Sequence, residues 1–343
     1  MNELSLISDG YKKIFGRSEL KIVPIPASGS DRKYYRIGDN KSSIIGAYNP
    51  NSEENKAFVG FTKHFISKGL PVPEIYGYLP DEYIYFLQDL GDINLFTWLH
   101  QKPSGNVFDD ETVGLYKKVL EILLLFQTRG IDGLDLELCY PHRSFDKQSM
   151  MWDMNYFKYM FLKLISVPFN EKKLENDFNV LTEFLLEAGQ NYFLYRDFQS
   201  ANIMILNSNP WFIDYQGGRR GAPQYDVASL LYDAKAHIPI ETNEMLLDYY
   251  TDIFCNTTKE NRDRFIEHYT GFSIIRLMQA MGAFGFRGLY EKKTTFTESI
   301  VPAVNLLTSI INSGKLPVNI TELKQTISII PDTKLFRNLV ERI

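Results

Sequence analysis

Residues 192–218 contain three polar side chains whose types and spacing could support phosphoryl transfer. An apolar run ends in Asp197, and Asn202 follows five residues later. A second apolar run, at 211–213, ends in Asp214. An aspartate can accept the proton of an attacking hydroxyl, whereas an amide oxygen and a carboxylate can hold Mg²⁺, because hard cations prefer oxygen ligands. We therefore interpret Asp197 as a base and Asn202 and Asp214 as metal ligands.

The aspartate and asparagine at this spacing are weak evidence alone, because both residue types favour turns and could simply cap a loop. The flanking strand patterns and the second aspartate make the set more specific, as does the Gly217-Gly218 pair that follows it. A motif match gains weight from such context. The catalytic interpretation is therefore favoured over a structural one.

A turn of small residues, Ser28-Gly29-Ser30-Asp31-Arg32, lies between two predicted strands in the first part of the chain. Small residues let backbone N–H groups approach phosphate oxygens closely, and such concavities bind anions. A plain β-hairpin turn could have the same sequence, but the Asp197 set further along the chain favours a phosphate loop. We expect Ser28, Gly29, Ser30, Asp31 and Arg32 to contact a nucleotide.

The lysine that a protein kinase places on its third strand to bind the phosphates is missing. The third predicted strand, at 43–48, reads SIIGAY. Arg32, Lys33 or Arg36 could supply the positive charge instead, and we favour Arg32 because it lies closest to the turn. The missing lysine is also the main argument for a nucleotide-binding regulatory protein without turnover.

The elements that must position these residues change in type near residue 90. Apolar alternation predicts strands at 22–25, 34–37, 43–48, 74–78 and 83–87, with amphipathic helices at 3–15 and 53–67. Helical patterns then dominate, at 94–101, 109–129, 146–166, 170–189, 224–237, 242–255, 259–290 and 296–313. The predicted fold class is α+β with two lobes: a small antiparallel β lobe at 1–90 and a large, mostly helical lobe at 91–343.

The composition is that of an ordinary globular protein, with 44% apolar and 23% charged residues in 343. A net charge of −5 argues against a nucleic-acid partner, because phosphate backbones need basic patches. Cys139 and Cys255 offer no disulfide framework or metal spacing. The sequence shows no signal-peptide core and no apolar stretch near the ~20 residues that span a bilayer. We expect a cytoplasmic protein whose partner is a small molecule, with no membrane, nucleic-acid or obligate protein partner.

Taken in order along the chain, the motifs resemble those of the aminoglycoside/choline phosphotransferase family. The segments that match are GSDRKYYR at 29–36, LQDLG at 87–91, RDFQSAN at 196–202, IDYQ at 213–216, YDVASLL at 225–231 and RLMQAMGAF at 276–284. Within the family, the chain is most similar to the bacterial cell-wall amino-sugar kinases. These phosphorylate N-acetylmuramate and N-acetylglucosamine at the anomeric hydroxyl.

This resemblance implies a protein-kinase-like fold, with ATP and Mg²⁺ as cofactors and the small lobe as the nucleotide-binding one. It gives the three polar residues of 192–218 the roles inferred above from their chemistry. The ATP phosphates would lie under Ser28–Arg32. The connector residues that would face adenine through their backbone are Gln88, Asp89 and Leu90.

Two neighbours of the catalytic motif are expected to support it. The general family pattern has a histidine two positions before the base, where this chain has Tyr195. We expect Tyr195 to anchor the loop by hydrogen bonds. Asp226 opens a predicted helix, where it could cap the helix or hold the catalytic loop rigid by hydrogen bonds.

Four residues are candidates for binding the acceptor. Asp153 lies on a helix that borders the acceptor pocket in the resembled family and could bind sugar hydroxyls. Gln199 could orient the acceptor or brace the loop. Arg219 and Arg220 follow Asp214 closely; they could be solvated surface charges, or one could bind an anionic group such as a lactyl carboxylate or a phosphate, because arginine suits planar bidentate recognition.

These observations favour a small-molecule kinase that phosphorylates a hydroxyl of an amino sugar, of the N-acetylmuramate/N-acetylglucosamine type, in cell-wall sugar recycling. A choline- or aminoglycoside-type kinase is the first alternative, although cationic acceptors call for an acidic pocket. A regulatory pseudokinase is the second. The sequence leaves open the acceptor, the hydroxyl and the oligomeric state.

Overall fold

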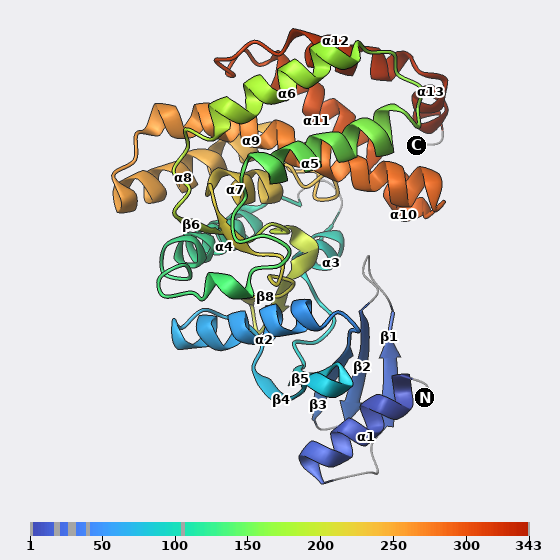
Figure 1. The fold of residues 1–343 in the computed structure, drawn as a ribbon. Helices are drawn as coiled ribbons and strands as arrows, with labels where there is room; N and C mark the ends of the chain where they lie inside the picture. Colours follow the sequence, from blue (N-terminus) through green and yellow to red (C-terminus); the bar gives the residue numbers. More distant parts are fainter. Residues whose placement is uncertain (1–2, 17–20, 27–31, 39–41, 104–106, 342–343) are drawn as a thin grey trace.

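The computed structural model describes residues 3–16, 21–26, 32–38, 42–103 and 107–341, and its elements divide into two lobes (Figure 1). We call the part from Glu3 to Gln88 the sheet lobe and the part from Leu95 to Val340 the helical lobe. The sheet lobe contains α1 (Glu3–Phe15), β1 (Lys21–Ile25), β2 (Lys33–Gly38), β3 (Ser43–Tyr48), α2 (Ser52–Ser67), β4 (Ile75–Leu79) and β5 (Ile84–Gln88). All five strands and both helices agree closely with the ranges predicted from the sequence.

The five strands form one antiparallel sheet in the order β1-β2-β3-β5-β4. In the register of β2 and β3, Tyr34 lies opposite Ala47. Tyr34 and Ala47 belong to the core that the sheet shares with α2 and the helical lobe, whereas Tyr35 and Ile37 pack with α1. Side chains therefore alternate along β2 between the face toward the helical lobe and the face covered by α1.

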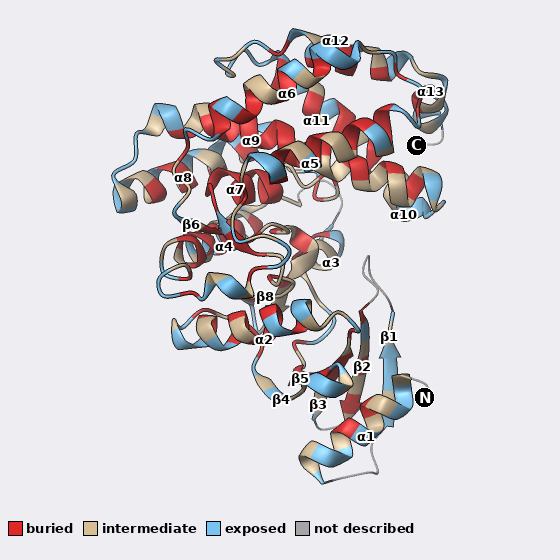
Figure 2. Ribbon diagram, viewed as in Figure 1, coloured by how far each residue is buried: buried red, intermediate tan, exposed pale blue. Residues whose placement is uncertain are grey.

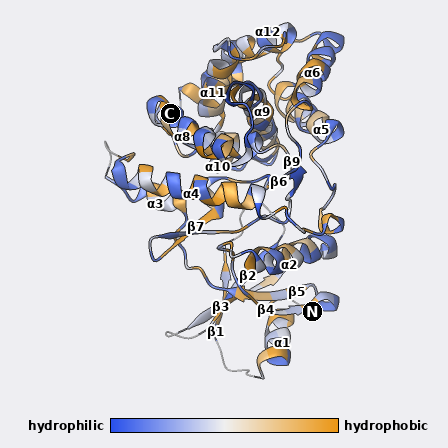
Figure 3. Ribbon diagram, turned by 90° about the vertical axis from the view of Figure 1, so that its left-hand side faces the viewer, coloured by the Kyte–Doolittle hydropathy of each residue, from blue (hydrophilic) through white to orange (hydrophobic). Residues whose placement is uncertain are grey.

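Helix α2 connects the two lobes. It lies between the sheet and the helical lobe in two perpendicular views (Figures 1 and 3), and the side chain of Asn51 caps its first turn by accepting from the Glu54 N–H. The ring of Phe58 stacks on Tyr85 of β5 at 5.0 Å and on Tyr215 of the helical lobe at 5.1 Å. This aromatic stack fixes the first turns of α2 beside the residues that follow Asp214.

The helical lobe surrounds the long helix α9, which is buried along much of its length (Figure 2) and packs against α5, α7 and α11. The helices of this lobe up to α9, and α11, are α3 (Leu95–His100), α4 (Asp110–Thr128), α5 (Lys147–Phe157), α6 (Glu171–Leu185), α7 (Gln224–Leu231), α8 (Ile240–Thr258), α9 (Arg262–Ala283) and α11 (Ile300–Asn312). The helices α10 (Thr294–Thr297), α12 (Thr321–Ile329) and α13 (Lys334–Val340) complete it. The sequence patterns had not predicted α12 and α13.

Two helices of this lobe end in π-helical turns. Helix α5 continues as η3 (Lys158–Leu162) and α9 as η5 (Phe284–Tyr290), which is why the sequence predicted single longer helices there. The two turns touch: a Cβ on Gly285 would lie 1.8 Å from the Met160 carbonyl oxygen. Glycine is therefore required at this crossing.

Four short strands interrupt the helices and hold the segment that carries Asp197, Asn202 and Asp214. β6 (Tyr192–Leu194) pairs with β9 (Arg219–Gly221), and β7 (Ile203–Leu206) pairs with β8 (Asn209–Phe212). Strand β9 was missed by the sequence prediction because its residues, two arginines and a glycine, show no apolar pattern. No helix among the described residues is both long and apolar enough to span a bilayer.

Candidate active site

The three predicted catalytic residues come together at the ends of β6 and β8. Asn202 donates from Nδ2 to the Asp197 carbonyl oxygen at 2.9 Å and to Asp214 Oδ2 at 3.3 Å. The backbone N–H of Ile213 donates to the Asn202 carbonyl oxygen at 3.1 Å. The two segments that the sequence places a dozen residues apart therefore form one site.

Two residues of this site have left-handed backbone conformations. The φ angle is 84° at Arg196 and 68° at Asp214, and neither residue is glycine. Such conformations are unfavourable for residues with a Cβ, and they cluster at functional sites whose surroundings enforce them. The strain lies immediately before Asp197 and at Asp214 itself.

Two aspartates hold the catalytic loop at its two ends. Asp226 of α7 accepts from the backbone N–H groups of Tyr195 and Arg196 at 2.6 and 2.9 Å. Asp233, just beyond α7, accepts from the Ser200 hydroxyl at 2.5 Å and from its N–H at 3.1 Å. Of the two possibilities for Asp226, the structure shows the loop contact, because the N-cap position of α7 is Pro223. The sequence had not singled out Asp233.

Tyr195 occupies the position of the family's histidine and ties the two halves of the site together. It is 1% exposed, and its hydroxyl donates to the Ile213 carbonyl oxygen at 2.6 Å, one residue before Asp214. The expected anchoring hydrogen bond is therefore confirmed.

Arg32 lies at the edge of this site, although it belongs to the sheet lobe, immediately before β2. It is 4% exposed and forms an ion pair with Glu54 of α2, Nη2 to Oε2, at 3.1 Å. Its Nη1 donates to the Tyr34 hydroxyl at 3.0 Å and lies 3.9 Å from Asp214 Oδ1. The Nε atom is buried with no hydrogen-bond partner among the described residues. A buried arginine next to Asp214, the predicted metal ligand, thus has one N–H without a partner in the described part of the chain.

The other two basic residues near the turn face elsewhere. Lys33 pairs with Glu3 of α1 at 2.5 Å, on the opposite face of the sheet. Arg36 pairs with Asp89 at 2.6 Å and with Asp92 at 2.8 Å. Among the three candidates for the missing third-strand lysine, Arg32 is the one that reaches Asp214.

The connector residues are fixed to the sheet through their polar groups. Gln88 donates from its N–H to the Glu74 carbonyl oxygen at 2.9 Å, and Leu90 is 5% exposed. Asp89 accepts from Arg36 and, at 2.6 Å, from the Ser43 hydroxyl. Burial alone would raise the pKa of Asp89, but these hydrogen bonds stabilise the charged carboxylate, and the net result is a lowered pKa. Ser28, Gly29, Ser30 and Asp31 lie outside the described residues.

Asp153 and Gln199, two predicted acceptor-binding residues, brace the catalytic loop. Asp153 is 6% exposed, and both of its carboxylate oxygens accept from Arg196 at 2.6 Å. The N–H of Gln199 donates to the Asp197 carbonyl oxygen at 3.0 Å, and its carbonyl oxygen accepts from the Asn202 N–H at 2.9 Å. Contact of either side chain with an acceptor stays a prediction.

Arg219 and Arg220 differ sharply in environment, because adjacent residues of β9 point to opposite faces. Arg219 is 7% exposed and donates from Nε and Nη2 to the Gly217 carbonyl oxygen at 3.1 and 3.0 Å. Burial, and then the nearby charge of Arg196, lower the pKa of Arg219 to about 10. The side chain of Arg220 is exposed.

The oxygen atoms at the site fit a hard cation. Burial, and then the negative charge of Asp197, raise the pKa of Asp214, while the amide of Gln216 opposes this shift by donating to Asp214 Oδ1 at 2.7 Å. The other amide atom of Gln216, Oε1, is buried without a partner among the described residues. Oxygen ligands from Asn202 and Asp214, beside an unsatisfied amide oxygen, match the preference of Mg²⁺.

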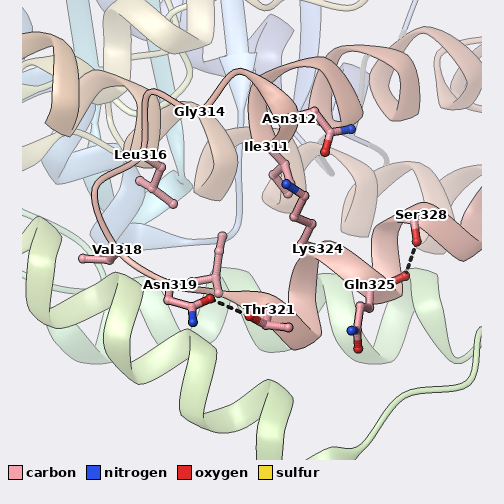
Figure 4. A pocket seen from close by; sticks show the side chains of 11 residues that line it. Ile311, Asn312, Gly314, Leu316, Val318, Asn319, Thr321, Lys324, Gln325 and Ser328 are labelled. Carbon is pink, nitrogen blue, oxygen red and sulfur yellow. Dashed lines mark hydrogen bonds between the residues drawn. The ribbon is translucent and has the colours of Figure 1, made fainter.

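A separate pocket of about 490 Å³ lies at the far side of the helical lobe (Figure 4). It is lined by the end of α11, the connection that follows it and α12, including Asn312, Thr321 and Lys324. None of the residues described above lines it. Its lining contains one cation and no carboxylate, so it offers no groups for the chemistry of the Asp197 site.

Comparisons with known proteins agree with this geometry. The model of the "Phosphotransferase enzyme family" matches residues 21–265. The N-acetylmuramate/N-acetylglucosamine kinase of Pseudomonas aeruginosa is 26% identical over 219 residues, which are 62% of this chain. The chain spans about 60% of the length of that relative.

Solved structures show the same fold. Choline kinase LicA from Streptococcus pneumoniae superposes with a TM-score of 0.57 at 14% identity, covering 90% of this chain and 100% of that one. Amicoumacin kinase hAmiN, in complex with AMP-PNP, Ca²⁺ and Ami, gives 0.61 at 11% identity, covering 94% and 97%. The predicted fold class, an α+β kinase-like fold with an antiparallel β lobe and a larger helical lobe, is confirmed.

Proposed function

The chain belongs to the phosphotransferase enzyme family, and we propose that it transfers the γ-phosphoryl group of ATP to a hydroxyl of an amino sugar. The observation that supports this most directly is that Asn202 joins the other two residues, because its amide donates to the backbone carbonyl of Asp197 and to the carboxylate of Asp214. Phosphoryl transfer depends mainly on positioning and charge neutralisation, and this site offers both.

In the proposed reaction, the carboxylate of Asp197 accepts the proton of the acceptor hydroxyl. The hydroxyl oxygen forms a bond to the γ-phosphorus, the bond from that phosphorus to the β–γ bridging oxygen breaks, and ADP leaves with the bonding electrons. Asn202 and Asp214 would hold Mg²⁺, which when bound neutralises charge on the phosphates. Asp226 and Asp233 keep the loop fixed while the proton moves.

The sheet lobe would bind the nucleotide and the helical lobe the acceptor, with the boundary near residue 90. We infer that Arg32 replaces the third-strand lysine. Ala47, on the β3 face toward α2, is fully buried and leaves no basic side chain there. Arg32, which immediately precedes β2, instead pairs with Glu54 and brings its charge to 3.9 Å from Asp214 Oδ1. The turn at 28–31 and the backbone of Gln88–Leu90 would complete the ATP site.

An amino-sugar acceptor is supported by the similarity to the Pseudomonas aeruginosa kinase, whose name gives N-acetylmuramate and N-acetylglucosamine as its substrates. Such an activity would serve the recycling of cell-wall sugars in the cytoplasm. The alternative of a cationic acceptor, as in choline or aminoglycoside kinases, is disfavoured by the buried positive charge of Arg219. The alternative of a pseudokinase is disfavoured by Arg32, since this buried cation lies 3.9 Å from Asp214 Oδ1 and could replace the missing lysine.

The test is an acceptor panel with the purified protein, ATP and Mg²⁺. N-acetylmuramate, N-acetylglucosamine, choline and kanamycin are supplied in turn, and the phosphorylated product is identified by ³¹P NMR and mass spectrometry. We expect product with an amino sugar and none with choline or kanamycin. An Asp197→Asn preparation serves as the control for contaminating kinases. ATP binding without transfer to any acceptor would instead support the regulatory alternative.

A further inference from the structure

The ion pair between Arg32 and Glu54 is made through a single hydrogen bond. Arg32 Nη2 donates to Glu54 Oε2 at 3.1 Å, and no second hydrogen bond joins the two side chains among the described residues. Arginine and carboxylate groups frequently pair through two parallel hydrogen bonds. The Nε atom of Arg32 is buried without a partner in the described part of the chain, so a pair through Nε and Nη2 would satisfy one more donor. Other contacts must therefore hold the guanidinium in the observed orientation.

The first of these contacts comes from Tyr34, two residues further along the chain. Arg32 Nη1 donates to the Tyr34 hydroxyl at 3.0 Å, and the same nitrogen lies 3.9 Å from Asp214 Oδ1. The hydroxyl is neutral, so it fixes the direction of Nη1 without cancelling the charge of the guanidinium. The nitrogen that faces Asp214 is thus the one that Tyr34 holds.

The second contact acts on Glu54. Asn49, which is 4% exposed, donates from Nδ2 to Glu54 Oε2 at 3.0 Å, the same oxygen that accepts from Arg32. Asn49 is itself fixed, because its Oδ1 accepts from the N–H of Asn51, the N-cap residue of α2, at 3.1 Å. The carboxylate therefore offers one oxygen to both donors. The single-contact geometry of the ion pair is imposed from both of its sides.

Tyr34 also lies where the sheet has room for it. In the register of β2 and β3 it is opposite Ala47, which is fully buried and carries only a methyl group. Side chains of directly opposite residues lie on the same face of the sheet, with their Cβ atoms about 4.5 to 5.5 Å apart. The strand next to β3 thus supplies the hydroxyl that orients Arg32, on the face where β3 has no basic side chain.

From these contacts we propose that Tyr34 is a positioning residue for the nucleotide site. Its hydroxyl keeps Nη1 of Arg32 beside Asp214 and prevents the guanidinium from turning into a pair of two hydrogen bonds with Glu54. The proposal rests on the proposed function, in which Arg32 meets the phosphates of ATP. Without the hydroxyl, the guanidinium closes on Glu54, Nε gains a partner, and the positive charge is withdrawn from Asp214. Tyr34 acts only through Arg32.

The test measures nucleotide binding rather than turnover. Calorimetry with Mg²⁺ and the non-hydrolysable analogue AMP-PNP compares the wild type with Tyr34→Phe, which removes only the hydroxyl. We expect the Kd to rise about tenfold, the size of one lost hydrogen bond to a charged group. Tyr35→Phe is the matched control, since Tyr35 packs with α1 on the opposite face of the sheet, and it should leave the Kd unchanged. Thermal melts of each variant verify folding.

Two further backgrounds test whether Tyr34 acts through Arg32. In Arg32→Ala, adding Tyr34→Phe should cause no further loss of affinity, because residues that act as a unit are not additive. Glu54→Gln removes the charge that attracts the guanidinium, so it should restore part of the affinity that Tyr34→Phe loses. A hydroxyl that only stabilises the sheet would give neither result.

The outcomes separate this proposal from the proposed function. No effect of Tyr34→Phe where Arg32→Ala weakens binding would overturn the positioning role and leave the role of Arg32 intact. The same loss from Tyr34→Phe with and without Arg32, or an equal loss from Tyr35→Phe, would also overturn it. If Arg32→Ala leaves binding unchanged, the phosphate role of Arg32 fails and the positioning role fails with it. A loss through Tyr34 that Glu54→Gln relieves, in a protein that phosphorylates no acceptor, would support the positioning role and contradict the kinase assignment.

Discussion

The two sides of the candidate active site are held together in different ways. The catalytic loop is fixed by many short hydrogen bonds, among them those from Asp226 and Asp233 at its two ends. The proposed phosphate side rests on one guanidinium, that of Arg32, which pairs with Glu54 of α2 and lies 3.9 Å from the Asp214 carboxylate. The loop therefore requires a defined backbone, whereas the phosphate side requires only a positive charge at one place. This difference explains how the cation could come from a neighbouring strand without loss of the site.

The largest effect is expected at the centre of the catalytic loop. Replacing Asp197 by Asn removes the proton acceptor, and general-base catalysis contributes roughly 10²- to 10⁴-fold. We expect kcat to fall by about 10³-fold while the affinity for ATP, measured with a fluorescent analogue, changes little. Turnover near the wild-type level would refute the assignment of the base.

Removal of Arg32 is expected to have the next largest effect, and to change the KM for ATP as well as kcat. Arg32→Ala should raise the KM for ATP and lower kcat, together by about 100-fold, the size of a lost charge-stabilising donor. Arg32→Lys should recover part of this, because a positive charge near Asp214 is restored. Steady-state kinetics with varied ATP distinguishes the two sides: an effect of Arg32→Ala on the acceptor KM alone would contradict the phosphate role.

The residues of the site that the sequence predicted are those that lie close to one another along the chain. Asp197, Asn202 and Asp214 lie within 18 residues, and the two strand ends that bear them follow from local apolar patterns. Arg32 could be favoured because it lies next to the turn. Glu54 and Asp233 were missed, because their partners lie 22 and 33 residues away and the contacts depend on how α2 and α7 pack. No local pattern distinguishes such an aspartate or glutamate from a solvated one.

Asp233 provides a test of how far the rigidity of the loop matters. Asp233→Ala removes both hydrogen bonds to Ser200, and the turn that carries Asn202 should loosen. Mutation of residues that support metal ligands typically lowers metal affinity or activity by about 10- to 100-fold. We therefore expect about a tenfold fall in kcat, and a higher Mg²⁺ concentration should be needed for half-maximal activity. Asp248→Ala on α8, an aspartate 68% exposed in an ion pair with Arg262, is the control. A stability loss without a change in Mg²⁺ dependence would reduce Asp233 to a structural role.

The smallest effect concerns Asp226 at the other end of the loop, and it appears in stability rather than turnover. Burial raises the pKa of Asp226 from 3.8 to about 7, although the N–H groups of Tyr195 and Arg196 favour the charged form. Between these two values the folded protein holds a proton that the unfolded chain has lost. The contribution of this group to the free energy of unfolding therefore falls as pH rises across that window.

Asp226→Asn cannot titrate, so it should lack this dependence. Denaturant unfolding of both proteins is measured near pH 5 and near pH 8. The free energy of unfolding of the wild type, relative to that of Asp226→Asn, should be smaller at the higher pH. A difference that is the same at both values would show that the carboxylate is already charged in the folded protein at the lower pH. In that case the loop would be held by a permanent negative charge, as Arg32 is held by Glu54, and the two sides of the site would be more alike than their contacts indicate.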